Sequence, residues 1–189
     1  LGVDYIEGGW PGANPSDTEF FQKNLDLKNS KFTAFGMTKK SGRSAENDPG
    51  LSAIMNSNTE SVCLVGKTWD FHVDVALGIS KEQNLKNISE SANHIINSGK
   101  EFMFDAEHFF DGYKSNKEYA LSCIKSAFDQ GARWIVLCDT NGGTLPHEIS
   151  KIVADVSKHI PGKNLGIHAH NDTENAVANS LVAIQAGVR

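Results

Sequence analysis

The chain has 189 residues, 39% of them hydrophobic and 22% charged, which is typical of a soluble globular protein with one main core. Its net charge of -5 gives no support to nucleic-acid or anionic-membrane binding, and no apolar run approaches the roughly 20 residues of a membrane span. The chain has three cysteines, Cys63, Cys123 and Cys138, which lie in apolar stretches of the sequence. Because their number is odd, we expect buried free thiols in place of a disulfide framework, and hence a cytoplasmic location.

Short apolar runs recur along the chain at a spacing of about 30 residues. Most contain β-branched or aromatic residues, which is typical of strands buried on both faces in a parallel sheet. The predicted strands are 3–10, 31–38, 61–69, 101–109, 133–140 and 164–170.

Stretches with a helical period lie between these runs. The sequence SDTE at 16–19 predicts a helix capped by Ser16, and Asp48 followed by Pro49 predicts a second helix start. Apolar stripes at helical spacing predict three further helices. These cover 81–98, 117–130 and 146–159, whereas 69–80 is predicted as part helix and part loop.

Six strand–helix units fit successive right-handed βαβ crossovers. No Gly-rich dinucleotide fingerprint follows a strand, and a (β/α)₈ barrel needs eight units, so the alternatives are an open sheet and an incomplete barrel. Polar residues at the carboxyl ends of the strands favour an incomplete TIM barrel in the α/β class, because a barrel carries its chemistry at that end. They are Glu7, Lys67, Asp105, Glu107, Asp139, Thr140, His168 and His170.

The last strand run carries two imidazoles one residue apart, in the sequence NLGIHAHND at 164–172. Side chains two apart on a strand point the same way, so His168 and His170 can offer nitrogen lone pairs to one cation. The alternative is a pair of histidines hydrogen-bonded to their neighbours. We predict that they bind a divalent metal, with magnesium, manganese and zinc all open.

Several segments in order resemble the citramalate synthases, within the superfamily of metal-dependent acyl-CoA condensing enzymes and lyases that includes isopropylmalate and homocitrate synthases. The His-x-His-Asn-Asp signature is shared across that superfamily, whereas GKTWDFHV (66–73) and DAEHFFDGYK (105–114) are similar to citramalate synthases in particular. DYIEGGWPG (4–12), AFGMT (34–38) and LCDTNGGTLP (137–146) also match.

The resemblance implies a catalytic TIM barrel with a divalent metal at its mouth, acetyl-CoA as cosubstrate and a 2-oxo acid as acceptor. For citramalate synthases the acceptor is pyruvate and the products are (R)-citramalate and CoA, in isoleucine biosynthesis. It also implies a homodimer of the full-length enzyme.

The family pattern extends beyond this chain at both ends. The family's Asp-Arg-Glu motif of the first strand, its Asn ligand near the last strand and its C-terminal regulatory domain have no match here. The six units therefore match strands two to seven, and we expect the chain alone to be an inactive internal fragment with weak metal affinity.

Three other strand-end residues are candidates for the site. An inward carboxylate such as that of Glu107 could be a base, an orienter of the acetyl thioester or a partner for a buried cation. Glu107 matches a family position that looks catalytic, and Thr140 matches a threonine that binds the substrate carboxylate. Glu7 faces the same mouth and is a candidate substrate-side residue.

The remaining polar residues have ordinary structural explanations. Asp139 is expected to accept backbone N–H groups in a tight turn, Asp172 to cap a helix, and Asn171 and Asp172 to support a histidine. Lys67 could simply neutralise a carboxylate. Lys39, Lys40 and Arg43 are expected in a solvated loop.

Three rival functions keep parts of this interpretation. Isopropylmalate or homocitrate synthesis, or carbon–carbon cleavage of the kind that HMG-CoA lyases perform, would keep the barrel and change the substrate. A non-catalytic paralogue would keep the barrel alone, with a binding or regulatory role. An open-sheet binding protein with a structural histidine pair would show no metal dependence.

Overall fold

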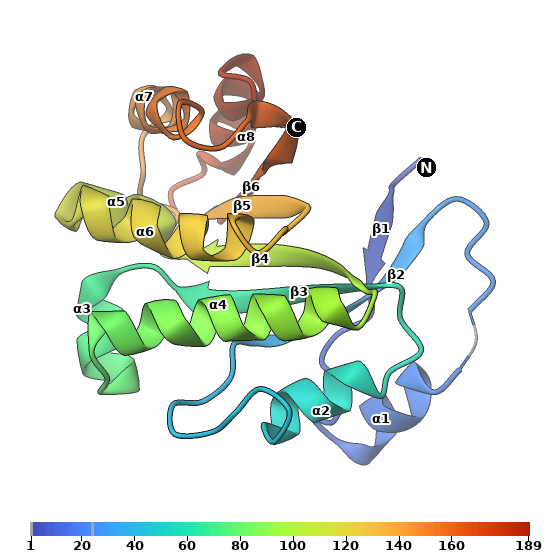
Figure 1. Cartoon of the computed structure of the whole chain (residues 1–189). Helices are drawn as coiled ribbons and strands as arrows, with labels where there is room; N and C mark the ends of the chain where they lie inside the picture. Colours follow the sequence, from blue (N-terminus) through green and yellow to red (C-terminus); the bar gives the residue numbers. More distant parts are fainter. Residues whose placement is uncertain (1, 24) are drawn as a thin grey trace.

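The computed structural model describes residues 2–23 and 25–189 and contains one parallel sheet of six strands in the order β1-β2-β3-β4-β5-β6 (Figure 1). The strands are β1 (Tyr5–Glu7), β2 (Lys31–Met37), β3 (Ser61–Lys67), β4 (Glu101–Glu107), β5 (Trp134–Asp139) and β6 (Leu165–Ala169). All six predicted strands are confirmed, with shorter bounds.

Helices connect the strands and cover one face of the sheet. They are α1 (Pro15–Phe21), α2 (Pro49–Met55), α3 (Asp70–His72), the π-helical turn η1 (Val73–Leu77), α4 (Lys81–Asn97), α5 (Phe109–Ser115), α6 (Lys117–Phe128), α7 (Pro146–Val156), the 3-10 turn η2 (Gly162–Asn164) and α8 (Ala176–Gln185). The predicted starts at Pro49 and in the three long helices are confirmed within a residue, and 69–80 is part helix and part loop as expected.

The predicted cap at Ser16 is wrong. Helix α1 begins two residues earlier, because Asn14 caps it by accepting a hydrogen bond from the Asp17 N–H at 2.9 Å. Pro15 follows at the first helical position, where its fixed φ and missing N–H carry no cost. An asparagine caps a helix as well as a serine does, and the proline decides between them.

Side chains alternate between the two faces of each strand, and the helix-facing set forms the core. Phe102, Phe104 and Ala106 of β4 are fully buried against the helices, together with Ile135 and Leu137 of β5. The opposite face therefore carries the alternate residues of each strand. This second face, which we call the inner face, holds most of the polar strand residues.

The sheet curls so that strands far apart in its order meet across the inner face. The hydroxyl of Tyr5 in β1 donates to Glu101 in β4 and accepts a hydrogen bond of 3.1 Å from Trp134 Nε1 in β5. A flat sheet would separate β1 from β5 by four strand spacings of about 4.8 Å. The six units thus form an incomplete TIM barrel, as predicted, and its inner face is the inside of the barrel.

Candidate functional site

The carboxyl ends of β3 and β4 carry an ion pair on the inner face. Lys67 and Glu107 are register partners in neighbouring strands, and Lys67 Nζ lies 2.5 Å from Glu107 Oε2. Their side chains are only 17% and 23% exposed. The expectation that Lys67 neutralises a carboxylate is therefore confirmed, and that carboxylate belongs to the candidate catalytic residue.

His168 and His170 lie side by side on the inner face at the end of β6. Their ring centroids are 5.0 Å apart, with 24° between the ring planes. Among the described residues no hydrogen bond engages a ring nitrogen of His170, and His168 contacts one carboxylate. Two imidazoles with accessible nitrogens on one strand face can supply two of the ligands of a divalent metal, so the residues present fit part of such a site.

Asp105 of β4 supports His168 from across the sheet. Its Oδ2 lies 3.7 Å from His168 Nδ1, and this carboxylate raises the pKa of His168. A carboxylate beside one ring nitrogen orients an imidazole and leaves the other nitrogen for a ligand. The same arrangement could hold a metal with a thiol as well, because Asp105, His168 and Cys138 offer donor atoms within 4.8 Å of one another.

Cys138 was not predicted as part of this cluster. It is the register partner of His168 and shares its face, and burial raises the pKa of its thiol well above the ordinary value. The three cysteines are buried and free, as expected. The pairing of Cys138 with His168 depends on strand register, which the sequence alone does not reveal.

Glu7 reaches the same region from β1. Its pKa is raised, first by desolvation and then by the Asp105 carboxylate, while His168 opposes the shift. Strand register places Glu7, Asp105 and His168 on the inner face at or near the carboxyl ends of their strands, although these are the first, fourth and sixth strands. The expected position of Glu7 at the mouth is confirmed; its role stays a prediction.

Thr140 joins the ends of β4 and β5. Its Oγ1 accepts a hydrogen bond of 2.9 Å from the His108 backbone N–H, directly after Glu107. His108 itself has a left-handed backbone conformation with φ of 56°, which is uncommon for a residue other than glycine. The Thr140 hydroxyl proton makes no hydrogen bond within the described residues, so the hydroxyl can still donate to a bound carboxylate.

Asp139 does not face the mouth. It points to the helix side, where Oδ1 accepts from Thr144 Oγ1 at 2.9 Å and Oδ2 from the Thr144 N–H and Asn179 Nδ2. The turn expected after β5 is thus present. Asp139 was counted with the strand-end residues, but strand alternation places it opposite Cys138.

The prediction that Asp172 caps the following helix is wrong. Helix α8 begins only at Ala176, and Asn171 Oδ1, not Asp172, accepts a hydrogen bond of 3.1 Å from the Ala176 N–H. Asp172 lies instead beside Gly142 of the preceding turn, where a Cβ on the glycine would meet its Oδ2 at 3.0 Å. Asn171 thus joins the strand end to the helix start, and no contact of Asn171 or Asp172 with a histidine ring is present among the described residues.

Only part of the expected solvated basic loop is solvated. Lys39 is buried, and its Nζ contacts Glu90 Oε2 at 3.0 Å and the Arg43 carbonyl oxygen at 2.8 Å. Lys40 and Arg43 line an open hollow of about 460 Å³ beyond β1 and β2. Lys39 thus holds the loop in place. The local sequence does not show that Lys39, and not its neighbour Lys40, is the buried lysine.

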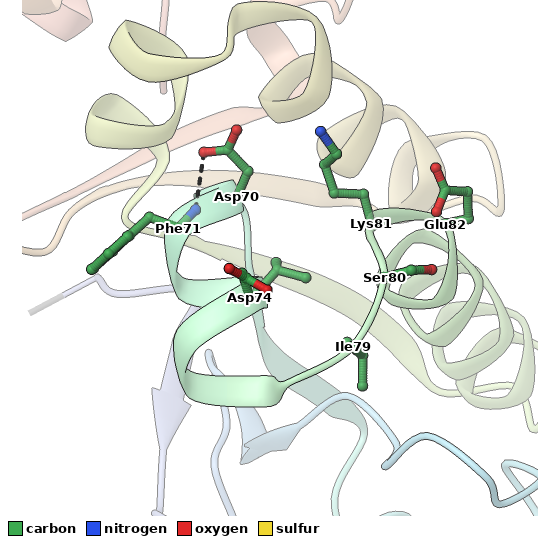
Figure 2. Close-up of a pocket in the computed structure, with 8 residues that line it drawn as sticks. Asp70, Phe71, Asp74, Ile79, Ser80, Lys81 and Glu82 are labelled. Carbon is green, nitrogen blue, oxygen red and sulfur yellow. Dashed lines mark hydrogen bonds between the residues drawn. The ribbon is translucent and has the colours of Figure 1, made fainter.

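A second hollow, of about 510 Å³, lies between α3–η1 and the start of α4 (Figure 2). Asp70, Asp74, Lys81 and Glu82 line it. None of the residues that the sequence predicts for catalysis or metal binding lines this hollow.

The model of the HMGL-like family matches residues 1–189. The chain belongs to the HMGL-like family. An (R)-citramalate synthase of Aquifex aeolicus is 52% identical over 191 residues, which cover 100% of this chain and 36% of that protein. A 2-isopropylmalate synthase of Sulfolobus acidocaldarius is 29% identical over 189 residues, covering 100% of this chain and 47% of that protein.

A solved structure agrees with the fold of this HMGL-like chain. The structure of an HMG-CoA lyase from "Acenitobacter baumannii" in complex with coenzyme A and 3-methylmalate aligns with a TM-score of 0.80 at 22% identity, covering 100% of this chain and 62% of that one. This likeness shows the barrel fold. None of the helices that the structure describes is both long and apolar enough to cross a membrane.

Proposed function

We propose that this chain is part of the catalytic barrel of an enzyme that condenses acetyl-CoA with pyruvate and releases (R)-citramalate and CoA. The carrying observation is the identity of 44–52% to five curated (R)-citramalate synthases along essentially the whole chain. A homocitrate synthase of Saccharolobus islandicus is 28% identical over 187 residues, and the 2-isopropylmalate synthase of Sulfolobus acidocaldarius is 29% identical over 189 residues. The chain spans about a third of the length of the citramalate synthases that it matches.

The proposed reaction has three steps. The acetyl methyl group loses a proton, the resulting carbon attacks the 2-oxo carbonyl of pyruvate, and water cleaves the thioester to give the second carboxylate and free CoA. His168 and His170 are the residues that would hold a divalent metal, which when bound supplies Lewis-acid polarisation of the oxo acid. The metal is predicted to be magnesium, manganese or zinc. The homodimer and the cytoplasmic location also stay predictions.

The other inner-face residues bind and orient the two substrates. The Thr140 hydroxyl has a free proton to donate to the pyruvate carboxylate, and its own position is fixed by the His108 N–H. Glu107 lies on the same edge, where its carboxylate can accept a proton from the acetyl methyl group. Glu7 closes the β1 side of this region.

A substrate panel tests this proposal. The full-length protein is incubated with acetyl-CoA and pyruvate, 2-oxoisovalerate or 2-oxoglutarate, and thiol release is followed. We expect kcat/KM to be highest with pyruvate by about tenfold or more, because the two extra methyl groups of 2-oxoisovalerate, or the carboxymethyl group of 2-oxoglutarate, must fit a pocket shaped for a smaller acceptor. A sample without oxo acid reports simple thioester hydrolysis. A preference for either larger oxo acid would contradict the substrate assignment.

A further inference from the structure

The Lys67–Glu107 pair is held by groups that fix the backbone of both residues. Thr68 is fully buried, and its hydroxyl donates to the Glu107 carbonyl oxygen at 2.7 Å. Asn84, also buried, donates to the Lys67 carbonyl oxygen at 2.8 Å and to the Tyr119 hydroxyl oxygen at 2.9 Å. With both backbones fixed, only the rotamers of the two side chains remain to be set.

Helix α5 packs closely behind this backbone. A Cβ on Gly112 would lie 2.4 Å from the Thr68 carbonyl oxygen, so only glycine permits the approach. On the β5 side, Thr140 accepts the N–H of His108, the residue after Glu107. Glu107 is thus held at its carbonyl and at the following amide, and its side chain leaves the strand in one direction.

The carboxylate of Glu107 has one cationic partner, Lys67, within the part of the chain that the structure describes. Nearby Asp105 lies on the same face two residues earlier and carries the same charge. Without the ammonium, repulsion by Asp105 and the attraction of water would both favour rotamers that turn Glu107 away from its present place. The ion pair therefore selects the rotamer.

We propose that Lys67 is a positioning residue that holds the Glu107 carboxylate towards the acetyl group; this inference rests on the proposed function. An ion pair that served stability alone would have only a small effect at such a partly exposed place and would leave the rate of the folded enzyme unchanged. A pair that sets the position of a reacting carboxylate has a larger effect on the rate, since a displacement of about 1 Å can cost about 100-fold. Lys67 thus acts on catalysis through Glu107 and touches neither substrate.

A double-mutant cycle on the full-length protein tests this role. Lys67→Met and Lys67→Arg are assayed with acetyl-CoA and pyruvate, together with Glu107→Gln and the Lys67→Met/Glu107→Gln double variant. We expect Lys67→Met to lower kcat about 100-fold with KM changed less than about threefold. Lys67→Arg should recover most of this loss, because it restores the cation. The double variant should be no slower than Glu107→Gln alone.

A matched ion pair controls for stability. Lys31 Nζ lies 2.8 Å from Glu101 Oε2 at the opposite end of the strands, so Lys31→Met removes a comparable pair far from the mouth. It should leave kcat unchanged.

The possible results separate the inference from the function. A double variant slower than Glu107→Gln by the full Lys67 factor would overturn the inference, because Lys67 would then act independently of Glu107. A kcat within twofold of the unsubstituted protein in Lys67→Met, or in Glu107→Gln, would also overturn it while leaving the proposed reaction intact. No turnover by the unsubstituted protein would overturn both.

Discussion

At the scale of single residues, the sequence indicates which strand-end residues have catalytic or metal-binding side chains more readily than the face of the sheet on which each one lies. His168, His170, Glu107 and Glu7 lie on the inner face where strand-end position placed them. Asp139 lies on the other face, since neighbouring residues of a strand point to opposite faces. Which of Cys138 and Asp139 shares the face of His168 is fixed by the register of β5 against β6, which the sequence does not give.

Cys138 and Lys39 show the same limit. Cys138 joins the histidine and aspartate only through its register with His168, and Lys39 is buried through contacts with α4, which lies 40 residues onward. Both facts arise from packing between distant segments. Local sequence carries no signal for either.

Thr140 gives a prediction at this scale. Thr140→Val keeps the shape of the side chain but removes the hydroxyl that accepts the His108 N–H and can donate to a substrate carboxylate. We expect kcat/KM in the full-length protein to fall about 10- to 100-fold, the range that follows from losing a buried hydrogen bond worth about 1–3 kcal/mol. Thr140→Ser should retain most of the activity, measured by thiol release.

Thr38 supplies the control, because it follows β2 much as Thr140 follows β5, and its hydroxyl makes no hydrogen bond among the described residues. Thr38→Val should change kcat/KM less than about twofold. Equal losses in Thr140→Val and Thr38→Val would contradict a specific role of the Thr140 hydroxyl.

At the scale of elements, the helices and strands followed from periodicity, while their ends depended on competition between neighbouring capping residues. Asn14 wins over Ser16 because Pro15 fits the first helical position, and α8 starts four residues after Asp172 because Asn171 accepts its first N–H. The close contact of α5 with the Thr68 backbone requires a glycine at position 112, and no sequence pattern predicts this contact. Apolar stripes identify a helix and its buried face but not the closeness of its approach.

Asp155 connects three helices and gives a pH prediction. It accepts hydrogen bonds from Lys117 of α6, Tyr113 of α5 and Lys158 beyond α7, and these partners hold the pKa of its carboxyl well below the usual range. A lowered folded-state pKa stabilises the fold above the unfolded pKa of about 4, and this stabilisation is lost as the pH falls through the folded value.

We therefore expect Asp155→Asn to lower the free energy of unfolding at pH 7 by about 1 kcal/mol or less, since the group is near the surface. The difference from the unsubstituted protein should shrink as the pH is lowered below about 4. Urea unfolding at several pH values measures it. Asp129→Asn, a substitution of an exposed acid with no ion pair in the described structure, should have no effect; a difference for Asp155→Asn that is independent of pH would contradict the assignment.

At the scale of the whole molecule, the sequence predicted an incomplete barrel, and the structure explains how polar groups from distant strands come together inside it. Tyr5, Glu101 and Trp134 join β1, β4 and β5 at one end, and this contact requires the sheet to curl. Curling brings Glu7, Asp105 and His168 together at the other end, although four strands and more than 150 residues separate Glu7 from His168. The mouth is thus a product of the curl of the sheet.

The last helix carries a feature of the same scale. Val177, Leu181 and Ile184 form an exposed apolar stripe along α8, at the spacing of one helix face. Helix α8 itself packs beside β6, the last strand of the sheet, and this stripe stays exposed. In a closed barrel a neighbouring helix covers such a surface.

The central claim is that His168 and His170 serve a metal-dependent condensation at this mouth. The most direct measurement is thiol release from acetyl-CoA and pyruvate by the full-length protein before chelation, after chelation and after return of magnesium, manganese or zinc. We predict that chelation abolishes citramalate formation, that at least one metal restores it, and that none restores it in the His168→Ala/His170→Ala variant. Citramalate formation that persists unchanged after complete metal removal would contradict the account.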